Sequence, residues 1–303
     1  MSIFQTPEWE KFKLQTGWQK SYRVDDVLVL QKNLPMGRTM LYSPRVSKYQ
    51  VSSIKYDVFL EKIRETADTN NTIFYRLEID DLKEKAHEAL EALEAVSFVK
   101  SFEEMQPEHT LVIDLSKTKD EILAEMKQKG RYNIKVAGKH GVNVKESDSI
   151  ENFYSLYETT AKRQKISYRN KDYFFKLFDI LKEKGYVKVF EATHTEKVLA
   201  AAIVVYYEKR ATYLFGGSSQ EEKQTMAPYL LHWNIMKDAK ENGFVEYDLF
   251  GVAPEDQPKH RWANVTSFKK KFGGNYLELV GSFDLVFKLF EYKLFKLAEK
   301  VRR

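Results

Sequence analysis

A run of three lysines, Lys269 to Lys271, lies between Phe268 and Phe272 in the segment SFKKKFGGN, residues 267–275. A basic surface loop seldom has large apolar rings on both sides, and the two glycines that follow permit a tight backbone turn. An ammonium group that aromatic rings shield from water acts on a nearby negative charge with little screening. The segment therefore predicts a site where one lysine faces developing negative charge.

A second group of basic residues recurs at four-residue spacing: Lys127, Arg131, Lys135 and Lys139. At this spacing they form one stripe on a helix, where like charges repel unless anions neutralise them. The surrounding segment, residues 127–145, contains six lysines and arginines and no acidic residue. Such a stripe can follow a phosphate backbone without reading bases, which favours a nucleic-acid partner. The alternative is an ordinary solvated face.

A third candidate is the segment ISYRNKDYFF, residues 166–175. Arg169 and Tyr173 are four residues apart and would lie on one side of a helix start, where free backbone amides favour anions. In the alternative interpretation, Asn170 only caps this helix and Arg169 is exposed. The residues alone leave both interpretations open.

Several common catalytic and cofactor motifs are absent from the sequence. The chain has no cysteine, which excludes disulfides, thiolate catalysis and cysteine-based metal sites, and its six histidines show no metal-binding spacing. It contains no G-x-S-x-G, no Walker loop and no dinucleotide G-x-G-x-x-G. It also contains no convincing pyrophosphate cradle before a helix. We therefore expect neither a metal nor coenzyme A.

The charge and hydropathy patterns favour a protein that meets phosphate-bearing partners in the cytoplasm. The net charge is only +5, but the basic residues cluster, as in 162–171 and 259–271. The acidic N-terminus with Pro7 is not typical of a secretory signal peptide. The longest apolar run, residues 198–207, is about half the ~20 residues that span a bilayer. We expect a soluble chain that at most lies peripherally on the plasma membrane.

The elements that must position these residues form two α/β groups. Thr118 and Glu121 form a capping box for the helix that carries the basic stripe. Gly216 and Gly217 permit a bulge or a close backbone approach at a strand end. Periodicity and stop signals predict helices over 7–15, 80–96, 149–163, 170–184, 227–242 and 284–302, and strands over 72–80, 109–116, 187–191, 197–207 and 211–217.

The sequence resembles the FemABX family along nearly its whole length. The resemblance rests on FQTPEWEKFK, IDLSKTKDEILAEMKQKGRYNIKVAGKHGV, TYLFGGSS, APYLLHWNIMKDAK, YDLFGV and FKKKFGG, which occur in the family's order. Members are aminoacyl-tRNA-dependent peptidyltransferases that build the cross-bridge of bacterial peptidoglycan. The resemblance implies an α/β fold of two tandem GCN5-related acetyltransferase (GNAT) domains, with mixed sheets flanked by helices. We expect residues 1–145 with 281–303 in domain 1 and 146–280 in domain 2, the C-terminal helix returning to domain 1.

The same resemblance implies a reaction and its residues. An amine of the stem peptide of a UDP-linked or lipid-linked precursor attacks the ester of an aminoacyl-tRNA, which is the co-substrate, and no other cofactor is implied. Lys269 resembles the residue that stabilises the tetrahedral intermediate. Predicted substrate contacts are Lys13 and Arg169 at the precursor's diphosphate, with Tyr173, Tyr213, Phe268 and Glu78. Predicted tRNA contacts are Lys127, Arg131, Lys135, Lys139, Lys270 and Lys271.

The chain also departs from the family pattern. Val46-Ser47 stands where Gly-Pro is frequent, and Phe215 stands where a relative has a second tyrosine. The short link in FEATHTEKVLAA predicts that the helical arm of some members is missing. Two other functions stay open: an N-acyltransferase that uses another acyl donor, and a non-catalytic RNA-binding protein. The terminal helix is basic and amphipathic, and we expect it to pack on domain 1, with membrane contact as the alternative.

Overall fold

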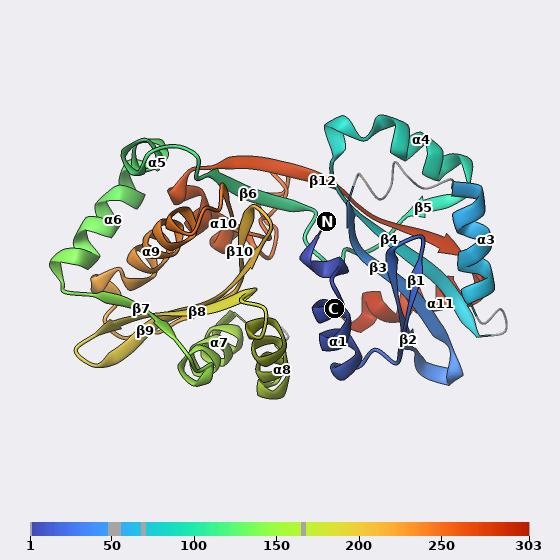
Figure 1. Cartoon of the computed structure of the whole chain (residues 1–303), viewed down its shortest axis with the longest axis horizontal. Coiled ribbons are helices and arrows are strands. Elements are labelled where there is room, and N and C mark those ends of the chain that lie inside the picture. The colour runs from blue at the N-terminus through green and yellow to red at the C-terminus, as the bar shows by residue number, and fades with distance from the viewer. Residues whose placement is uncertain (1, 48–55, 68–70, 165–167, 303) are drawn as a thin grey trace. The chain divides into compact units, whose positions relative to one another are not determined.

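The computed structural model describes residues 2–47, 56–67, 71–164 and 168–302. The chain forms two compact units (Figure 1). Unit 1 comprises Met1–Glu108 and Glu278–Arg303, and unit 2 comprises His109–Leu277.

The division between the units differs from the predicted one. The sequence placed residues 109–145 in domain 1, whereas the structure assigns them to unit 2. The reason is strand pairing and helix packing: β6 (His109–Asp114) pairs with β11 (Glu246–Asp248), and α6 (Gln128–Lys139) packs on α9 (Ala227–Glu241). The return to unit 1 falls at 277/278 rather than at 280/281.

Unit 1 is built on a mixed sheet in the order β1-β2-β3-β4-β12, with β5 paired to β12. β3 and β4 run parallel, whereas β1–β2, β2–β3 and β4–β12 are antiparallel. A parallel pair needs a crossover connection, which contains α3 (Tyr56–Thr66). The strands are β1 (Lys20–Val24), β2 (Val27–Asn33), β3 (Thr39–Ser47), β4 (Thr72–Leu82), β5 (Phe98–Lys100) and β12 (Asn275–Val286).

Alternate residues of β2 enter two separate cores, as the period of a strand requires. Val27 and Val29 join a cluster that includes Phe59 of α3, and Leu28 and Leu30 join a second cluster. The sheet is thus covered on both faces. The remaining helices of unit 1 are α1 (Pro7–Gln15), α4 (His87–Ala95) and α11 (Leu289–Arg302), with 3-10 turns at Ile3–Gln5, Pro35–Gly37 and Lys83–Lys85.

The C-terminal helix α11 returns to unit 1, which confirms the prediction, but it begins later than predicted. Residue 284 belongs to β12, opposite Arg76 of β4, and the two side chains form a buried ion pair that keeps this residue in the ladder. Tyr292 of α11 donates a hydrogen bond to Asp284 Oδ2 (2.7 Å), and its ring packs against Phe74.

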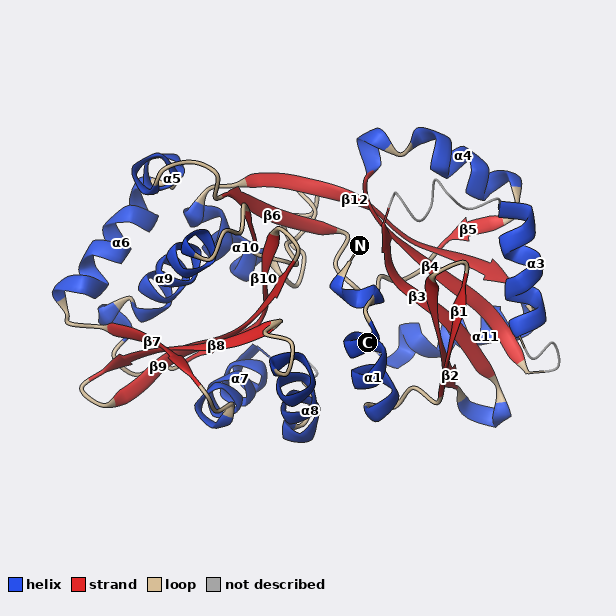
Figure 2. Ribbon diagram, in the orientation of Figure 1, coloured by secondary structure: helices blue, strands red, loops and turns tan. Residues whose placement is uncertain are grey.

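Unit 2 is built on a sheet in the order β6-β11-β10-β9-β8-β7. β10 and β11 run parallel, and the other neighbours are antiparallel. Figure 2 shows α9 with α6 over one face and α7 with α8 over the other. The further elements are β7 (Asn143–Ser147), β8 (Val187–His194), β9 (Lys197–Tyr207), β10 (Arg210–Ser218), α5 (Lys119–Glu125), α7 (Glu151–Gln164), α8 (Lys171–Lys182), α10 (Ala263–Lys269) and 3-10 turns η4 (Lys223–Thr225) and η5 (Lys270–Phe272).

The predicted basic helix is two helices in the structure. The Thr118–Glu121 capping box is confirmed, but the helix that it starts ends at Glu125. Lys127 has extended backbone angles and is the N-cap of α6. Arg131 donates hydrogen bonds to the carbonyls of Ala124 and Met126, which satisfies carbonyls at the end of α5.

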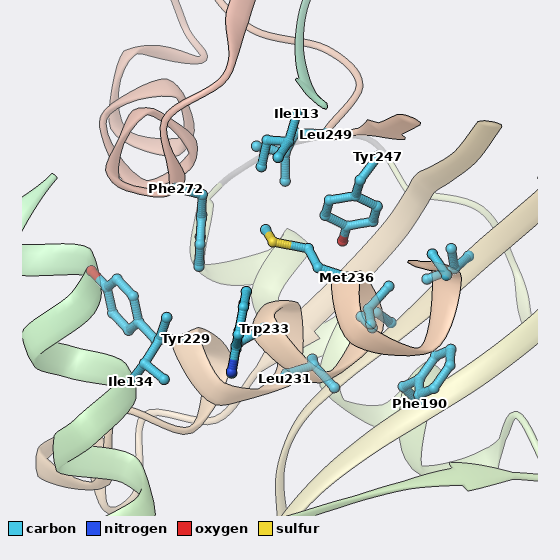
Figure 3. Close-up of a cluster of buried hydrophobic side chains, with 14 of the residues drawn as sticks. Ile113, Ile134, Phe190, Tyr229, Leu231, Trp233, Met236, Tyr247, Leu249 and Phe272 are labelled. Atoms are coloured by element: carbon cyan, nitrogen blue, oxygen red, sulfur yellow. The ribbon is translucent and has the colours of Figure 1, made fainter. Parts of the chain in front are cut away.

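The core of unit 2 lies between its sheet and α9 (Figure 3). Leu231 and Met236 of α9 are buried there against Phe190 of β8 and Tyr247 of β11. The adjacent strands β8 and β9 are joined by a two-residue turn, so the expected absence of an arm between these strands is confirmed.

Among the described residues, no helix has both the length and the apolar content needed to cross a bilayer.

Candidate active site

Lys269 is the last residue of α10, and its side chain points into unit 2. Only 6% of the residue is exposed. Its Nζ donates hydrogen bonds to the carbonyl oxygens of Gly251 (2.7 Å) and Phe250 (3.1 Å). These acceptors hold the ammonium in one direction, because each carbonyl fixes one N–H bond.

Asp248 builds the turn that presents these two carbonyls. Its Oδ1 accepts a hydrogen bond from the backbone N–H of Phe250 (2.7 Å) and another from the hydroxyl of Thr110. Phe250 has a φ of 58°, a left-handed conformation that is uncommon outside glycine and that this side-chain contact supports. The carboxylate that shapes the turn therefore also lies near the Lys269 ammonium.

Aromatic residues pack around the end of α10 that carries Lys269. The Nζ lies 5.6 Å from the centre of the Tyr213 ring, and Phe268 packs against Phe272 and His232. Burial lowers the pKa of Lys269 to about 7, and the charge of Asp248 opposes part of this shift. The ammonium is thus desolvated, and the aromatic ring beside it is that of Tyr213.

His232 of α9 packs against the rings of Tyr213 and Phe268. It is buried, and its Nδ1 lies 2.8 Å from the hydroxyl of Tyr247. Burial and the nearby charge of Lys269 lower the pKa of His232 to about 3, so the imidazole is neutral at pH 7. Burial also raises the pKa of Tyr247. A neutral ring beside the ammonium avoids a second positive charge in the same space.

A β-bulge in β10 directs Tyr213 toward Lys269. The pairing with β9 shifts between Tyr213 and Phe215, so these two side chains leave opposite faces of the strand. Tyr213 contacts His232, whereas Phe215 packs between Tyr157 and Phe174. Phe215 therefore lies on the other face of β10 from Tyr213.

The two glycines after the bulge are required by close approaches. A Cβ at Gly216 would lie 1.9 Å from the Tyr213 hydroxyl, and one at Gly217 would lie 2.4 Å from backbone atoms of Leu156 and Tyr157. Of the two predicted alternatives, the close approach is present at these glycines, whereas the bulge lies before them, between Tyr213 and Phe215. Gly216 leaves room for the Tyr213 ring, and Gly217 lets α7 pack directly on β10.

Substituting Gly217 by alanine should destabilise the protein. Backbone atoms of α7 cannot rotate away from the added Cβ, so we expect a loss of about 1–3 kcal/mol in the free energy of unfolding, measured in urea. Gly138→Ala is the matched control, because a Cβ there meets nothing within 4 Å and alanine favours the helix. Equal stability of both variants would contradict the close packing of α7 on β10.

Arg169 and Tyr173 lie together at the start of α8. The guanidinium stacks over the Tyr173 ring, with Cζ 5.1 Å from its centre. Asn170 caps the helix by accepting a hydrogen bond from the backbone N–H of Tyr173 (3.0 Å), and Arg169 is exposed. Burial raises the pKa of Tyr173 to about 12. The capping interpretation of Asn170 is confirmed, and the role of the pair in binding diphosphate stays a prediction.

Lys13, a predicted substrate contact, lies in unit 1. Its Nζ lies within 5.7 Å of the ring centres of Trp9, Phe12 and Trp18, and 9% of the residue is exposed. Three aromatic faces stabilise a cation at this position. Its role at the diphosphate stays a prediction.

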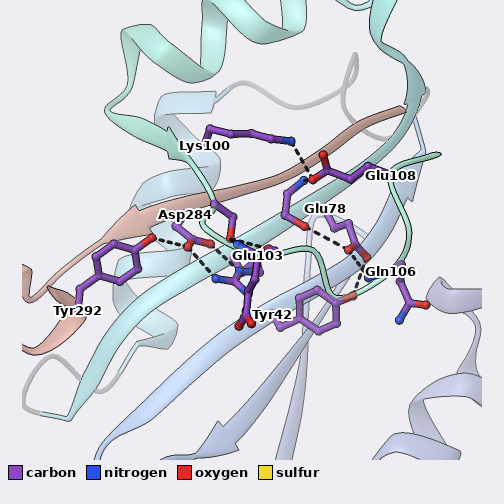
Figure 4. Close-up of polar contacts among 11 residues, drawn as sticks. Tyr42, Glu78, Lys100, Glu103, Gln106, Glu108, Asp284 and Tyr292 are labelled. Carbon is purple, nitrogen blue, oxygen red and sulfur yellow. Dashed lines mark hydrogen bonds and ion pairs between the residues drawn. The ribbon is translucent and has the colours of Figure 1, made fainter. Parts of the chain in front are cut away.

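Glu78, also a predicted substrate contact, is enclosed in unit 1 (Figure 4). Its carboxylate accepts hydrogen bonds from the Tyr42 hydroxyl (2.6 Å), the Gln106 backbone N–H (2.8 Å) and the Ser282 hydroxyl (3.2 Å). Burial raises its pKa, and the charge of Arg45 and the hydrogen bonds oppose this shift. These contacts make Glu78 a link between strands, and substrate contact stays a prediction.

The predicted tRNA contacts lie in unit 2 but differ in their surroundings. Lys127, Lys135 and Lys139 are exposed. Lys127 approaches η5, because its backbone N–H donates to the Lys271 carbonyl (3.2 Å). Lys270 pairs with Glu255 (2.9 Å). Arg131 differs, because its guanidinium holds the end of α5, so the stripe of four equivalent cations is not formed.

The structure thus brings Lys269, Phe268 and Tyr213 together in one cluster of unit 2. Sequence reasoning missed His232 and Asp248. The spacing of the six histidines gave His232 no role, and Asp248 carries no local signal beyond its place in YDLFGV. Their proximity to Lys269 depends on the packing of α9, β11 and α10.

Comparison with known proteins identifies the family. A sequence model of the FemAB family matches residues 1–196 and 187–300, which together cover nearly the whole chain. The chain belongs to the FemAB family. This membership confirms the predicted family and the predicted enzyme class, an aminoacyltransferase.

A curated relative agrees with the FemAB assignment, and solved structures share the fold. A lipid II:glycine glycyltransferase of Staphylococcus aureus (strain COL) is 22% identical over 99% of this chain and 91% of its own. A crystal structure of FemX is 21% identical and matches with a TM-score of 0.86 over 97% of this chain and 94% of its own. A tandem GNAT protein from the clavulanic acid biosynthesis pathway matches with a TM-score of 0.51 over 86% and 79%, at 12% identity. The predicted tandem GNAT-like fold is confirmed.

Proposed function

We propose that this FemAB protein transfers an amino acid from aminoacyl-tRNA to an amine of the stem peptide of a lipid-linked peptidoglycan precursor. The name of the Staphylococcus aureus relative, which specifies lipid II and glycine, supports the acceptor class. The observation that carries the proposal is the buried ammonium of Lys269, which two carbonyls hold in place.

The reaction needs orientation and charge stabilisation rather than a covalent enzyme intermediate. The amine nitrogen attacks the ester carbonyl carbon, a C–N bond forms, and the carbonyl oxygen becomes an oxyanion. The oxyanion then collapses, the bond to the ribose 3′ oxygen breaks, and the proton that the amine loses balances the proton that the 3′ oxygen gains. Because the ester is activated, aminoacyl-tRNA is the only co-substrate that the scheme requires.

Lys269 is the residue that we assign to the oxyanion. Its ammonium has three N–H bonds, two of which are donated to the carbonyls of Phe250 and Gly251. We assign the third to the oxyanion. Because 6% of the residue is exposed, water screens this charge little, so the ammonium acts more strongly than it would at the surface.

Two surfaces of unit 2 fit the polyanionic parts of the substrates. We assign Lys127, Lys135, Lys139 and Lys271 to tRNA phosphates, since these lysines extend from η5 along α6. We assign Arg169, with Tyr173 beneath it, to the precursor's diphosphate, because a stacked guanidinium is held ready for bidentate contact with phosphate oxygens.

A transfer assay tests the proposal. The chain is incubated with charged tRNA and either a lipid-linked or a nucleotide-linked precursor, and mass spectrometry follows the acceptor. We expect the acceptor to gain the mass of one aminoacyl residue with charged tRNA, and no gain with uncharged tRNA, with acetyl-coenzyme A or with an acceptor whose amine is acetylated. Gain from acetyl-coenzyme A would instead support an N-acyltransferase. Tight binding of charged and uncharged tRNA without turnover would support an RNA-binding protein.

The pH dependence of transfer reveals whether Lys269 acts as a cation. Its pKa of about 7 means that the ammonium is present at low pH and lost as the pH rises through this value. Titration of the acceptor amine affects wild type and Lys269→Met equally, so it cancels when the wild-type kcat is divided by the kcat of the variant. We expect this ratio to be constant below pH 7 and to fall about tenfold per pH unit above it. A ratio that rises with pH would show that Lys269 acts as a base.

A further inference from the structure

The outer face of α11 carries a stripe of apolar residues. Phe290, Leu294, Leu297 and Val301 are 71%, 51%, 59% and 82% exposed. Their spacing of four, three and four residues places them on one side of the helix. Tyr292 is buried on the other side of the helix, against the core of unit 1. α11 is therefore apolar on two opposite faces, of which only one is covered within unit 1.

Single exposed apolar residues are common, but a continuous row along a helix is not typical of a solvated surface. The stripe extends over eleven residue steps, about 17 Å at the rise of an α-helix. Leu289, at the start of α11, is also 61% exposed. We call the residues Phe290, Leu294, Leu297 and Val301 the apolar stripe.

The charges beside the apolar stripe are mostly positive. Lys293 and Lys300 are exposed along one edge of it, with Lys296 beyond them. Glu291 forms an ion pair with Arg38, with 3.2 Å between Oε1 and Nη2. One of the two acidic residues of the helix is therefore already neutralised within unit 1. Long lysine side chains beside an apolar row can place their ammonium groups at phosphates while the row enters an apolar layer.

We propose that the apolar stripe of α11 docks the protein on the surface of an anionic lipid bilayer, with the helix parallel to the membrane. The stripe would enter the boundary between headgroups and acyl chains, and Lys293 and Lys300 would contact lipid phosphates. This inference rests on the proposed function, since a lipid-linked acceptor is presented at such a surface.

A second copy of the chain is the competing occupant of the apolar stripe. An antiparallel two-fold contact between identical stripes places the same edge of each helix on the same side of the interface. Lysines of one copy would then lie close to lysines of the other, and like charges at that distance repel. The basic edge therefore favours an anionic lipid surface over self-association.

Vesicle flotation with the full chain tests the proposal. We expect binding to vesicles that contain phosphatidylglycerol, and much weaker binding to vesicles of phosphatidylcholine alone. The Leu294→Gln/Leu297→Gln double variant should lower the partition coefficient by roughly tenfold or more. Lys293→Glu/Lys300→Glu should weaken binding in the same direction, as should high salt. Val58→Gln is the matched control, because Val58 is 45% exposed on α3 of the same unit and its change should leave binding unaltered.

Three results would overturn the proposal. The first is that the wild-type chain does not bind the anionic vesicles. The second is that Val58→Gln lowers vesicle binding as much as the double glutamine variant does. The third is that sedimentation velocity shows a wild-type dimer and that the double glutamine variant is a monomer. All variants keep the buried face of α11, so circular dichroism should show unchanged folding. Transfer to a water-soluble acceptor separates the two ideas. Transfer without vesicle binding would overturn only the docking inference, and vesicle binding without transfer would overturn only the proposed function.

Discussion

Replacing Lys269 by methionine is expected to lower kcat for aminoacyl transfer by at least about a hundredfold, with little change in KM. The charge is needed where the oxyanion develops and not in the ground-state complex, so the loss should fall on kcat. Methionine preserves most of the side-chain volume and removes a desolvated ammonium, so the fold should remain intact. Single-turnover transfer from charged tRNA measures the effect.

The control for this substitution is Lys184→Met, which removes a positive charge from an exposed position of unit 2. Its kcat should stay within about twofold of wild type, because exposed charges act weakly at a distance in salt. Wild-type kcat in the Lys269→Met variant would remove the oxyanion assignment. A rise in KM with unchanged kcat would instead assign Lys269 to substrate binding.

Replacing Arg76 by methionine is expected to lower the free energy of unfolding by about 3–5 kcal/mol. Arg76 is fully buried, and it donates from Nε and Nη2 to the two carboxylate oxygens of Asp284 at 2.7 and 2.8 Å. Its Nη1 donates to Glu103 (3.1 Å). Tyr292 of α11 also donates a hydrogen bond to Asp284 (Figure 4). The substitution leaves a carboxylate uncompensated in the core. Urea unfolding followed by tryptophan fluorescence measures the loss.

Two variants show whether the ion pair causes this loss. Adding Asp284→Leu to Arg76→Met also removes the fully buried carboxylate, and it should recover a large part of the stability, because the remaining acidic partner, Glu103, is less buried than Asp284. Arg38→Met, which affects the more exposed pair with Glu291, should cost at most about 1 kcal/mol. A double variant as unstable as the single one would show that the loss comes from packing.

Local signals in the sequence were sufficient where neighbouring residues decide the structure. Pro7 starts α1 as predicted, and the Thr118–Glu121 box starts α5. Both signals act over a single helical turn, so distant residues cannot easily override them. The short link between β8 and β9, which leaves no room for an arm, was also predicted, and in the structure it is a two-residue turn.

The predicted basic stripe shows where local reasoning ends. A repeat of four residues is correct for one helix, but the chain is extended at Met126 and Lys127, and Arg131 uses its guanidinium to complete α5. The approach of Lys127 to the carbonyl of Lys271 contributes to this arrangement, and it joins residues far apart in the sequence. Similarly, residue 284 stays in a strand because of Arg76, which periodicity around 284 does not reveal.

Residue patterns alone predicted two α/β groups and a lysine at a site of developing negative charge, and the resemblance to the FemABX family implied the tandem GNAT fold and the choice of Lys269. Those inferences depend on residue types and on order along the chain. Only the tertiary structure showed the direction of the Lys269 side chain, the neutral His232 beside it and the turn that Asp248 stabilises. It also showed that one face of α11 is uncovered. Each of these depends on which distant side chains exclude water from a group or leave it exposed, and only the packed chain decides that.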